Sequence, residues 1–376
     1  MRQKKIIIGL LWLFPAFTGA EPLVSPTWGF RIDPPEGYQY IDGDGRDHFS
    51  FLSASGAALD LAVYAGGTHA SVETLAEDTR KRLGIRGEIS FFEYRRKGAA
   101  LFDVDMAGRA EGWALCVELE APRGEPAPLL LALAYGPPGR EDLRVFHLSA
   151  LDSIAPTEAD RRVPGPVTEF TYPRGNLEPK PLAGLAVSAL VGEFDPEGAQ
   201  ALVDREFAVL RRYIDSPLWR EAWSRYYRAV YRDSFDRLAG AAFALERTWN
   251  VPADQEENRG LAEKALAWVQ SFAYERNFLG SDFVNPVSAA LEGRGDCDSR
   301  ALLWAIILKQ ANIPAAIMVS QEFGHAMGLA DIPGIGARFE WAGKRWLTAE
   351  TTAPVALGRI AADMSETSKW LGVVLE

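Results

Sequence analysis

The sequence has 376 residues, of which 48% are hydrophobic and 24% are charged, and its formal net charge is -11. This composition is typical of a globular protein that is long enough for more than one domain. The acidic balance argues against a protein that binds nucleic acid, because that binding needs clustered lysine and arginine.

The first twenty residues are predicted to be a secretory signal peptide. Three basic residues lie among the first five, an apolar run covers residues 6–14, and small residues at 18–20 precede Glu21. The apolar run is too short for a membrane-spanning helix, and an uncleaved N-terminal anchor is the alternative. Because no later segment is long and apolar enough to cross a bilayer, we expect a secreted or periplasmic protein.

Residues 22–155 are predicted to form a smaller α+β module that is rich in strands. Short apolar or alternating runs at strand length cover residues 49–52, 59–64, 114–119 and 129–135. One helix is expected between Ser71, a good N-cap, and Gly84, a good terminator. The opening stretch at residues 28–35 faintly resembles the first strand of bacterial PsbP/Mog1-like domains.

Residues 156–182 are rich in proline, glycine and charge, and are predicted to be a partly extended linker to residues 183–376. Helical spacing of apolar residues follows over 197–249, with a break at which Ser216 is expected to cap the next helix, and again over about 257–274. Strands are then predicted at residues 315–320, 325–330, 337–341 and 345–349, with a tight turn at Ala342-Gly343.

The sequence has only two cysteines, Cys116 and Cys297. Cys297 follows a glycine-bearing loop and precedes an apolar helix, so it is expected at a helix N-terminus. There the helix dipole and free N–H groups favour a nucleophilic thiolate and can stabilise an oxyanion, although Asp296 and Asp298 oppose the charge on the thiol.

A histidine and an acid follow Cys297 at spacings that let the chain return to it. His325 opens a predicted strand 28 residues later, and Glu350 ends another strand 25 residues after His325. A cysteine with a histidine is the minimum thiol catalyst, and a neighbouring carboxylate orients the imidazole. We therefore expect Cys297, His325 and Glu350 to be the catalytic residues.

Three blocks carry a family resemblance: GDCDSRALL at residues 295–303, GHA at 324–326 and TAETTAP at 348–354. Together they resemble the bacterial transglutaminase-like superfamily over about residues 255–360. The resemblance implies a papain-like core in which helices pack on an antiparallel sheet, with cysteine, histidine and an acid in that order. Glu350 departs from the family, in which many members carry aspartate.

The segment at residues 269–274 resembles the helix that packs beside the site in this superfamily. Gln270 and Tyr274 are its candidates for lining the cleft or donating to an oxyanion, and a purely structural role is the alternative. The resemblance implies an enzyme that acts on amide bonds of peptides or proteins, with cell-envelope substrates the natural class for an exported chain.

Other interpretations of the same residues stay open. The chain is either a cysteine peptidase or amidase, a transamidase, or an inactive envelope binding module on the same fold. Cys297 is alternatively a buried structural cysteine, or is joined to Cys116 in a disulfide. No cofactor or metal is expected, because the few histidines and cysteines lack metal-ligand spacing.

Overall fold

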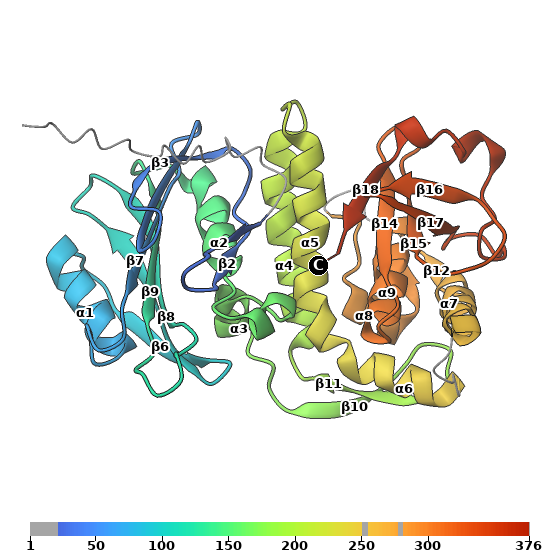
Figure 1. Cartoon of the computed structure of the whole chain (residues 1–376), viewed down its shortest axis with the longest axis horizontal. Coiled ribbons are helices and arrows are strands. Elements are labelled where there is room, and N and C mark those ends of the chain that lie inside the picture. Colours follow the sequence, from blue (N-terminus) through green and yellow to red (C-terminus); the bar gives the residue numbers. More distant parts are fainter. Residues whose placement is uncertain (1–21, 250–254, 277–280, 376) are drawn as a thin grey trace, which may run out of the picture.

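The computed structural model of the chain describes residues 22–249, 255–276 and 281–375, so the predicted signal peptide lies outside the described residues. Strand-rich units stand on either side of a central pair of helices, α4 and α5 (Figure 1). The chain is a mixture of helices and mainly antiparallel sheets, which is the predicted α+β class. Within the described ranges, no helix is both long and apolar enough to span a membrane.

The N-terminal unit is built on one antiparallel sheet of seven strands in the order β3-β4-β5-β9-β8-β7-β6. Its strands are β3 (Tyr38–Gly43), β4 (His48–Ser53), β5 (Ala58–Tyr64), β6 (Ile89–Tyr94), β7 (Lys97–Asp105), β8 (Glu111–Glu118) and β9 (Leu129–Gly136). Because side chains alternate between the faces of a strand, the sheet buries two separate apolar clusters, one on each face.

Helices cover both faces of this sheet, as Figure 1 shows. On one side lies α1 (Val72–Leu83), which begins after the predicted cap Ser71 and ends at Gly84 in the left-handed conformation. On the other side lie α2 (Arg144–Asp152) and the short strands β1 (Leu23–Val24) and β2 (Arg31–Ile32).

The predicted linker is folded over most of its length, which corrects the sequence-based interpretation. It contains the 3-10 turn η2 (Glu158–Arg162), α3 (Pro166–Thr171) and β10 (Leu177–Pro181). The prolines mislead here because Pro166 occupies the first turn of α3, where a missing N–H costs nothing. Thr168 ties α3 to the N-terminal unit by donating from its backbone N and its Oγ1 to the Asp152 carboxylate, at 2.7 and 2.6 Å.

Helices then dominate up to the candidate site. They are α4 (Asp195–Leu210), α5 (Trp219–Arg237), α6 (Ala239–Trp249), α7 (Gln255–Gln270), α8 (Pro286–Glu292) and α9 (Cys297–Gln310), and β11 (Ser188–Gly192) pairs with β10 before them. Two predicted boundaries are wrong. Helix α5 begins after Leu218, whose N–H donates to the Ser216 hydroxyl, and α7 ends at Gln270 because the next residues pair as a strand.

The C-terminal sheet has five antiparallel strands in the order β16-β17-β15-β14-β18. They are β14 (Ala315–Ser320), β15 (His325–Ala330), β16 (Arg338–Trp341), β17 (Lys344–Ala349) and β18 (Leu371–Val374). The predicted hairpin turn is confirmed, since Ala342 and Gly343 have φ of 49° and 73° between β16 and β17. Helix α9 is buried along almost its whole length against β14 and β15.

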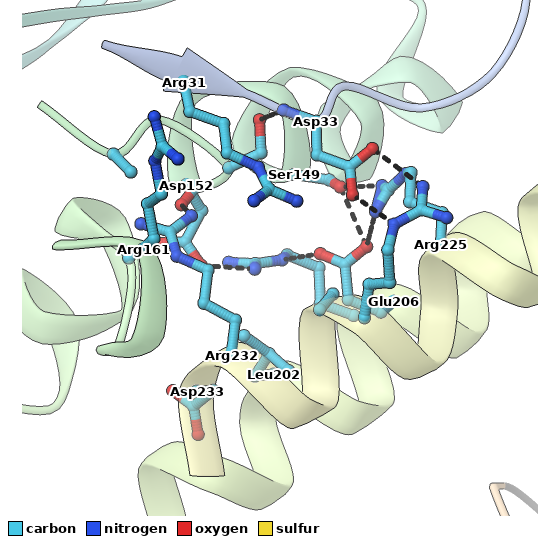
Figure 2. A pocket seen from close by; sticks show the side chains of 16 residues that line it. Arg31, Asp33, Ser149, Asp152, Arg161, Leu202, Glu206, Arg225, Arg232 and Asp233 are labelled. Carbon is cyan, nitrogen blue, oxygen red and sulfur yellow. Dashed lines mark hydrogen bonds and ion pairs between the residues drawn. The ribbon is translucent and has the colours of Figure 1, made fainter. Parts of the chain in front are cut away.

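Charged side chains fill the interface between the N-terminal unit and helices α4 and α5 (Figure 2). Arg225 of α5, 3% exposed, donates to Glu206 of α4 at 2.8 and 2.9 Å and also to Ser149 of α2. Arg205 of α4 forms an ion pair with Asp152 at 2.5 Å. Separating such a pair would leave a buried charge without its partner, which is strongly destabilising. These pairs therefore fix the N-terminal unit against α4 and α5.

Candidate active site

Cys297 is the first residue of α9, as the sequence predicts. Asp296 caps the helix by accepting hydrogen bonds from the backbone N and the hydroxyl of Ser299, at 2.9 and 2.7 Å. Buried Arg300 holds the preceding loop by donating to the carbonyl oxygens of Gly295 and Phe272, at 3.1 and 2.8 Å. The thiol therefore stands at a braced helix N-terminus, where the backbone N–H of Asp298 is directed at the sulfur.

His325 and Glu350 are brought together by neighbouring antiparallel strands. His325 opens β15 and Glu350 follows β17, and the imidazole Nε2 lies 2.8 Å from Glu350 Oε2. Thr352 donates its backbone N and its hydroxyl to the other carboxylate oxygen, at 2.8 and 2.5 Å. Burial alone would raise the pKa of Glu350, but the bonds from His325 and Thr352 outweigh it and lower that pKa.

The sulfur of Cys297 lies beside the start of β15, the strand that His325 opens. The backbone N–H of Ala326, the residue after His325, is directed at it and favours the thiolate. Helix α9 packs on β15, and the Trp370 ring lies against the His325 ring with centroids 6.4 Å apart. His325 and Glu350 are thus in contact at one end of the sheet, and the Cys297 sulfur lies against the backbone of the residue that follows His325.

The electrostatic environment of the thiol differs from the one expected. Burial raises the pKa of Cys297, which is 4% exposed, and the charges of Asp298 and Asp296 raise it further. These effects outweigh the N–H groups of Ala326 and Asp298, so the low thiol pKa expected from the helix N-terminus is not found. Burial and the nearby Asp296 in turn raise the pKa of Asp298.

Gln270 lies beside the site, but both hydrogens of its amide nitrogen are engaged. Its Nε2 donates to the carbonyl oxygens of Glu350 and Val355, at 2.8 and 3.0 Å. It therefore supports the segment that carries Glu350, and it has no free N–H for an oxyanion. This geometry supports the structural alternative.

Tyr274 lies at the rim of the site. It belongs to β12 (Ala273–Tyr274), which pairs in parallel with β13 (Arg294–Gly295) immediately before the Cys297 loop. Its ring is 52% exposed and packs on the Arg300 guanidinium, 5.5 Å from the ring centroid. Burial and the nearby Cys297 raise the pKa of Tyr274 to about 12, so the neutral hydroxyl is available as a donor at this rim.

The two cysteines are not bridged, and the disulfide alternative is wrong. Cys116 is buried in β8 beneath α1, whereas Cys297 belongs to the core of the C-terminal unit. Burial alone raises the pKa of Cys116, which gives this second thiol the character of an inert core residue.

One group of side chains in the described ranges brings three metal-ligating atoms together. One atom each from Asp296, Cys297 and Asp298 lie within 4.8 Å of one another. Ser299 donates two hydrogen bonds to Asp296 Oδ1, Tyr227 donates one to Asp298 Oδ1, and the Cys297 thiol lies 3.9 Å from Asp298 Oδ2, so these carboxylate oxygens already have partners within the protein. The absence of a metal requirement stays a prediction.

Three contacts around the site were not predicted from the sequence. Thr352 lies in the motif with Glu350, and its spacing two residues later is the signal for such a local hydrogen bond. Tyr227 and Trp370 carry no such signal, because their contacts are distant in the sequence. Tyr227 is 71 residues from Asp298, and Trp370 is 45 residues from His325.

No family model and no curated protein sequence matches this chain. Among solved structures, it is similar to Legionella pneumophila LapG at 12% identity and a TM-score of 0.23, over 45% of this chain and 79% of that chain. The calcium-bound and EGTA-treated forms of LapG match with the same identity and TM-score, over 81% and 78% of their chains. A TM-score this low does not establish a common fold.

Proposed function

We propose that this protein is an exported thiol enzyme of the transglutaminase-like kind, which acts on amide bonds of peptides or proteins through Cys297, His325 and Glu350. The observation that carries the proposal is the 2.8 Å contact between His325 and Glu350 at the strand end beside Cys297. A carboxylate that orients an imidazole, and an imidazole that takes the proton of a thiol, are the parts of an acyl-transfer catalyst. The natural substrates of an exported enzyme are peptides or proteins of the cell envelope.

Because its environment favours the protonated form, the resting Cys297 is a thiol. Glu350 occupies His325 Nε2, which leaves Nδ1 as the nitrogen that takes the thiol proton while Sγ attacks the substrate carbonyl. The negative oxygen that forms is stabilised by N–H groups at the α9 N-terminus. His325 then gives the proton to the leaving amine, and the C–N bond breaks.

The acyl-thioenzyme is resolved by reversal of the same steps. His325 takes a proton from water or from an acceptor amine, whose oxygen or nitrogen attacks the thioester carbonyl. The C–S bond breaks and the proton returns to sulfur. Water gives a peptidase or amidase, and an amine gives a transamidase.

The alternative is a catalytically inactive binding module on the same scaffold. The burial of Cys297 and the two flanking carboxylates favour it, because they oppose thiolate formation. The two functions differ in one chemical event, the formation of an acyl bond to the Cys297 sulfur.

Mass spectrometry after incubation with p-nitrophenyl acetate detects that event. The proposal predicts an acetyl group on Cys297 that is absent in Cys297→Ala and retained in Cys116→Ala. His325→Ala is expected to reduce the acylation rate at least tenfold, because a general base typically contributes about 10²- to 10⁴-fold to a rate. A folded, reduced protein that acquires no acetyl group on Cys297 would favour the binding module.

A further inference from the structure

Helix α5 connects the N-terminal unit to the candidate active site. Successive residues of a helix are about 100° apart, so Arg225 and Arg228 share one side and Tyr227 lies on another. The arginine side faces the N-terminal unit, and the tyrosine side packs toward α9. One turn of α5 therefore contacts both the N-terminal unit and α9.

The contacts to the N-terminal unit are charged and directional. Arg228 donates to both carboxylate oxygens of Asp33, each at 2.9 Å. Arg225 donates directly to the Ser149 hydroxyl and also to the buried Glu206 (Figure 2 shows Asp33, Ser149, Glu206 and Arg225). A bidentate pair such as Arg228–Asp33 fixes orientation as well as distance. Together with the Arg225 contacts, it holds this turn of α5 against the N-terminal unit.

The contact on the opposite side ends at the nucleophile. The Tyr227 hydroxyl donates to Asp298 Oδ1 at 2.5 Å, and the other carboxylate oxygen, Oδ2, lies 3.9 Å from the Cys297 sulfur. Both Tyr227 and the adjacent Tyr226 are buried, but among the described residues the Tyr226 hydroxyl has a longer contact, 3.5 Å to the Ser281 hydroxyl. Asp298 thus lies between a strong donor and the thiol.

We propose that Tyr227 is a positioning residue for Cys297, and that the N-terminal unit keeps it in place by holding α5. The proposal rests on the proposed function, since it concerns the same thiol. While Tyr227 binds Oδ1, the Asp298 carboxylate is fixed and its charge is partly satisfied. Without that donor, the thiol S–H becomes the nearest remaining donor, and Asp298 retains the proton that His325 must take.

The first test compares Tyr227→Phe with Tyr226→Phe, which removes a neighbouring hydroxyl with no strong contact. The rate of Cys297 alkylation by iodoacetamide is measured from pH 6 up to the highest pH at which circular dichroism shows the fold intact, with the labelled peptide identified by mass spectrometry. Tyr227→Phe is expected to move the midpoint of the profile upward by about half a pH unit, which is about a threefold slower rate below the midpoint. Tyr226→Phe should leave the midpoint unchanged.

This readout separates positioning from a loss of packing, because a merely loosened site would change the rate at every pH by one factor. An unchanged or lowered midpoint in Tyr227→Phe overturns the proposal. An equal shift in Tyr226→Phe also overturns it.

The second test asks whether the N-terminal unit acts through Tyr227. Asp33→Asn weakens the pair with Arg228, which is only partly buried, so the fold is expected to persist; thermal unfolding checks this. Asp142→Asn is the control, because it breaks the exposed pair with Arg212, which also joins the two units but lies outside α5. Asp33→Asn should slow alkylation about twofold, and Asp142→Asn should not.

Non-additivity is the decisive outcome, since it measures coupling directly. In the Tyr227→Phe background, Asp33→Asn should have no further effect on the rate. Additive effects, or no effect of Asp33→Asn alone, overturn the role of the N-terminal unit. A rate that does not respond to His325→Ala contradicts the proposed function instead, so the two failures are distinguishable.

Discussion

Replacing Glu36 with glutamine is expected to stabilise the protein in a pH-dependent way. Glu36 is 6% exposed at the interface between the units, and among the described residues nothing hydrogen-bonds its Oε2. The nearest cation is Arg225, 3.9 Å away. The pKa of Glu36 is raised from 4.5 to about 8, because burial and the charge of Asp33 outweigh the opposing charges of Arg225 and Arg228.

The sign and size of this effect on the free energy of unfolding follow from proton linkage. Between pH 4.5 and pH 8 the folded protein keeps the Glu36 proton and the unfolded chain releases it, so the free energy of unfolding falls as pH rises. The slope for one group is about 1.4 kcal/mol per pH unit. Glutamine resembles the protonated carboxyl and does not titrate, so Glu36→Gln should gain roughly 3 kcal/mol over the wild type between pH 5 and pH 8.

Urea unfolding of both proteins at pH 5, 6, 7 and 8 measures this difference. The difference should grow with pH and level off above about pH 8. A difference that stays constant over the series would mean that Glu36 is ionised in the folded state throughout, and that burial does not hold its proton.

Three further predictions concern packing and the site. Gly328→Ala should lower the free energy of unfolding by about 1–3 kcal/mol in the same urea assay, because an added Cβ would lie 2.4 Å from the buried Trp304 ring; full stability would contradict the packing. Thr352→Val removes the 2.5 Å hydroxyl bond to Glu350, so acylation of Cys297 by p-nitrophenyl acetate should slow several-fold while circular dichroism stays unchanged; an unaltered rate would show that this bond does not orient Glu350. Limited proteolysis should spare residues 158–171 and cut first among the exposed residues at 173–179, and early cuts within 158–171 would mean that α3 is not held against the N-terminal unit.

Local sequence signals predicted much of the C-terminal unit. The apolar run after Cys297 indicates a buried helix, and alternation with Ala342-Gly343 indicates the β16–β17 hairpin, because both depend on neighbouring residues alone. His325 and Glu350 were predicted on adjacent antiparallel strands, and β15 does pair with β17, although β16 lies between them in the chain.

Long-range contacts account for what the sequence did not predict. Helix α7 stops at Gln270 because residues 273–274 pair with a strand 21 residues later, which no local pattern announces. The raised pKa of the Cys297 thiol depends on burial and on the direction of two carboxylates, and neither is visible in the order of residues. Tyr227 reaches Asp298 across 71 residues, so its role requires the structure.

Alkylation of the folded, reduced protein at pH 7 shows whether His325 activates the Cys297 thiol. Iodoacetamide should label Cys297 at least tenfold faster in the wild type than in His325→Ala, whereas Cys116 should be labelled in neither until the protein is unfolded, because it is buried in β8. Equal labelling of Cys297 in the two folded proteins would mean that His325 does not activate the thiol.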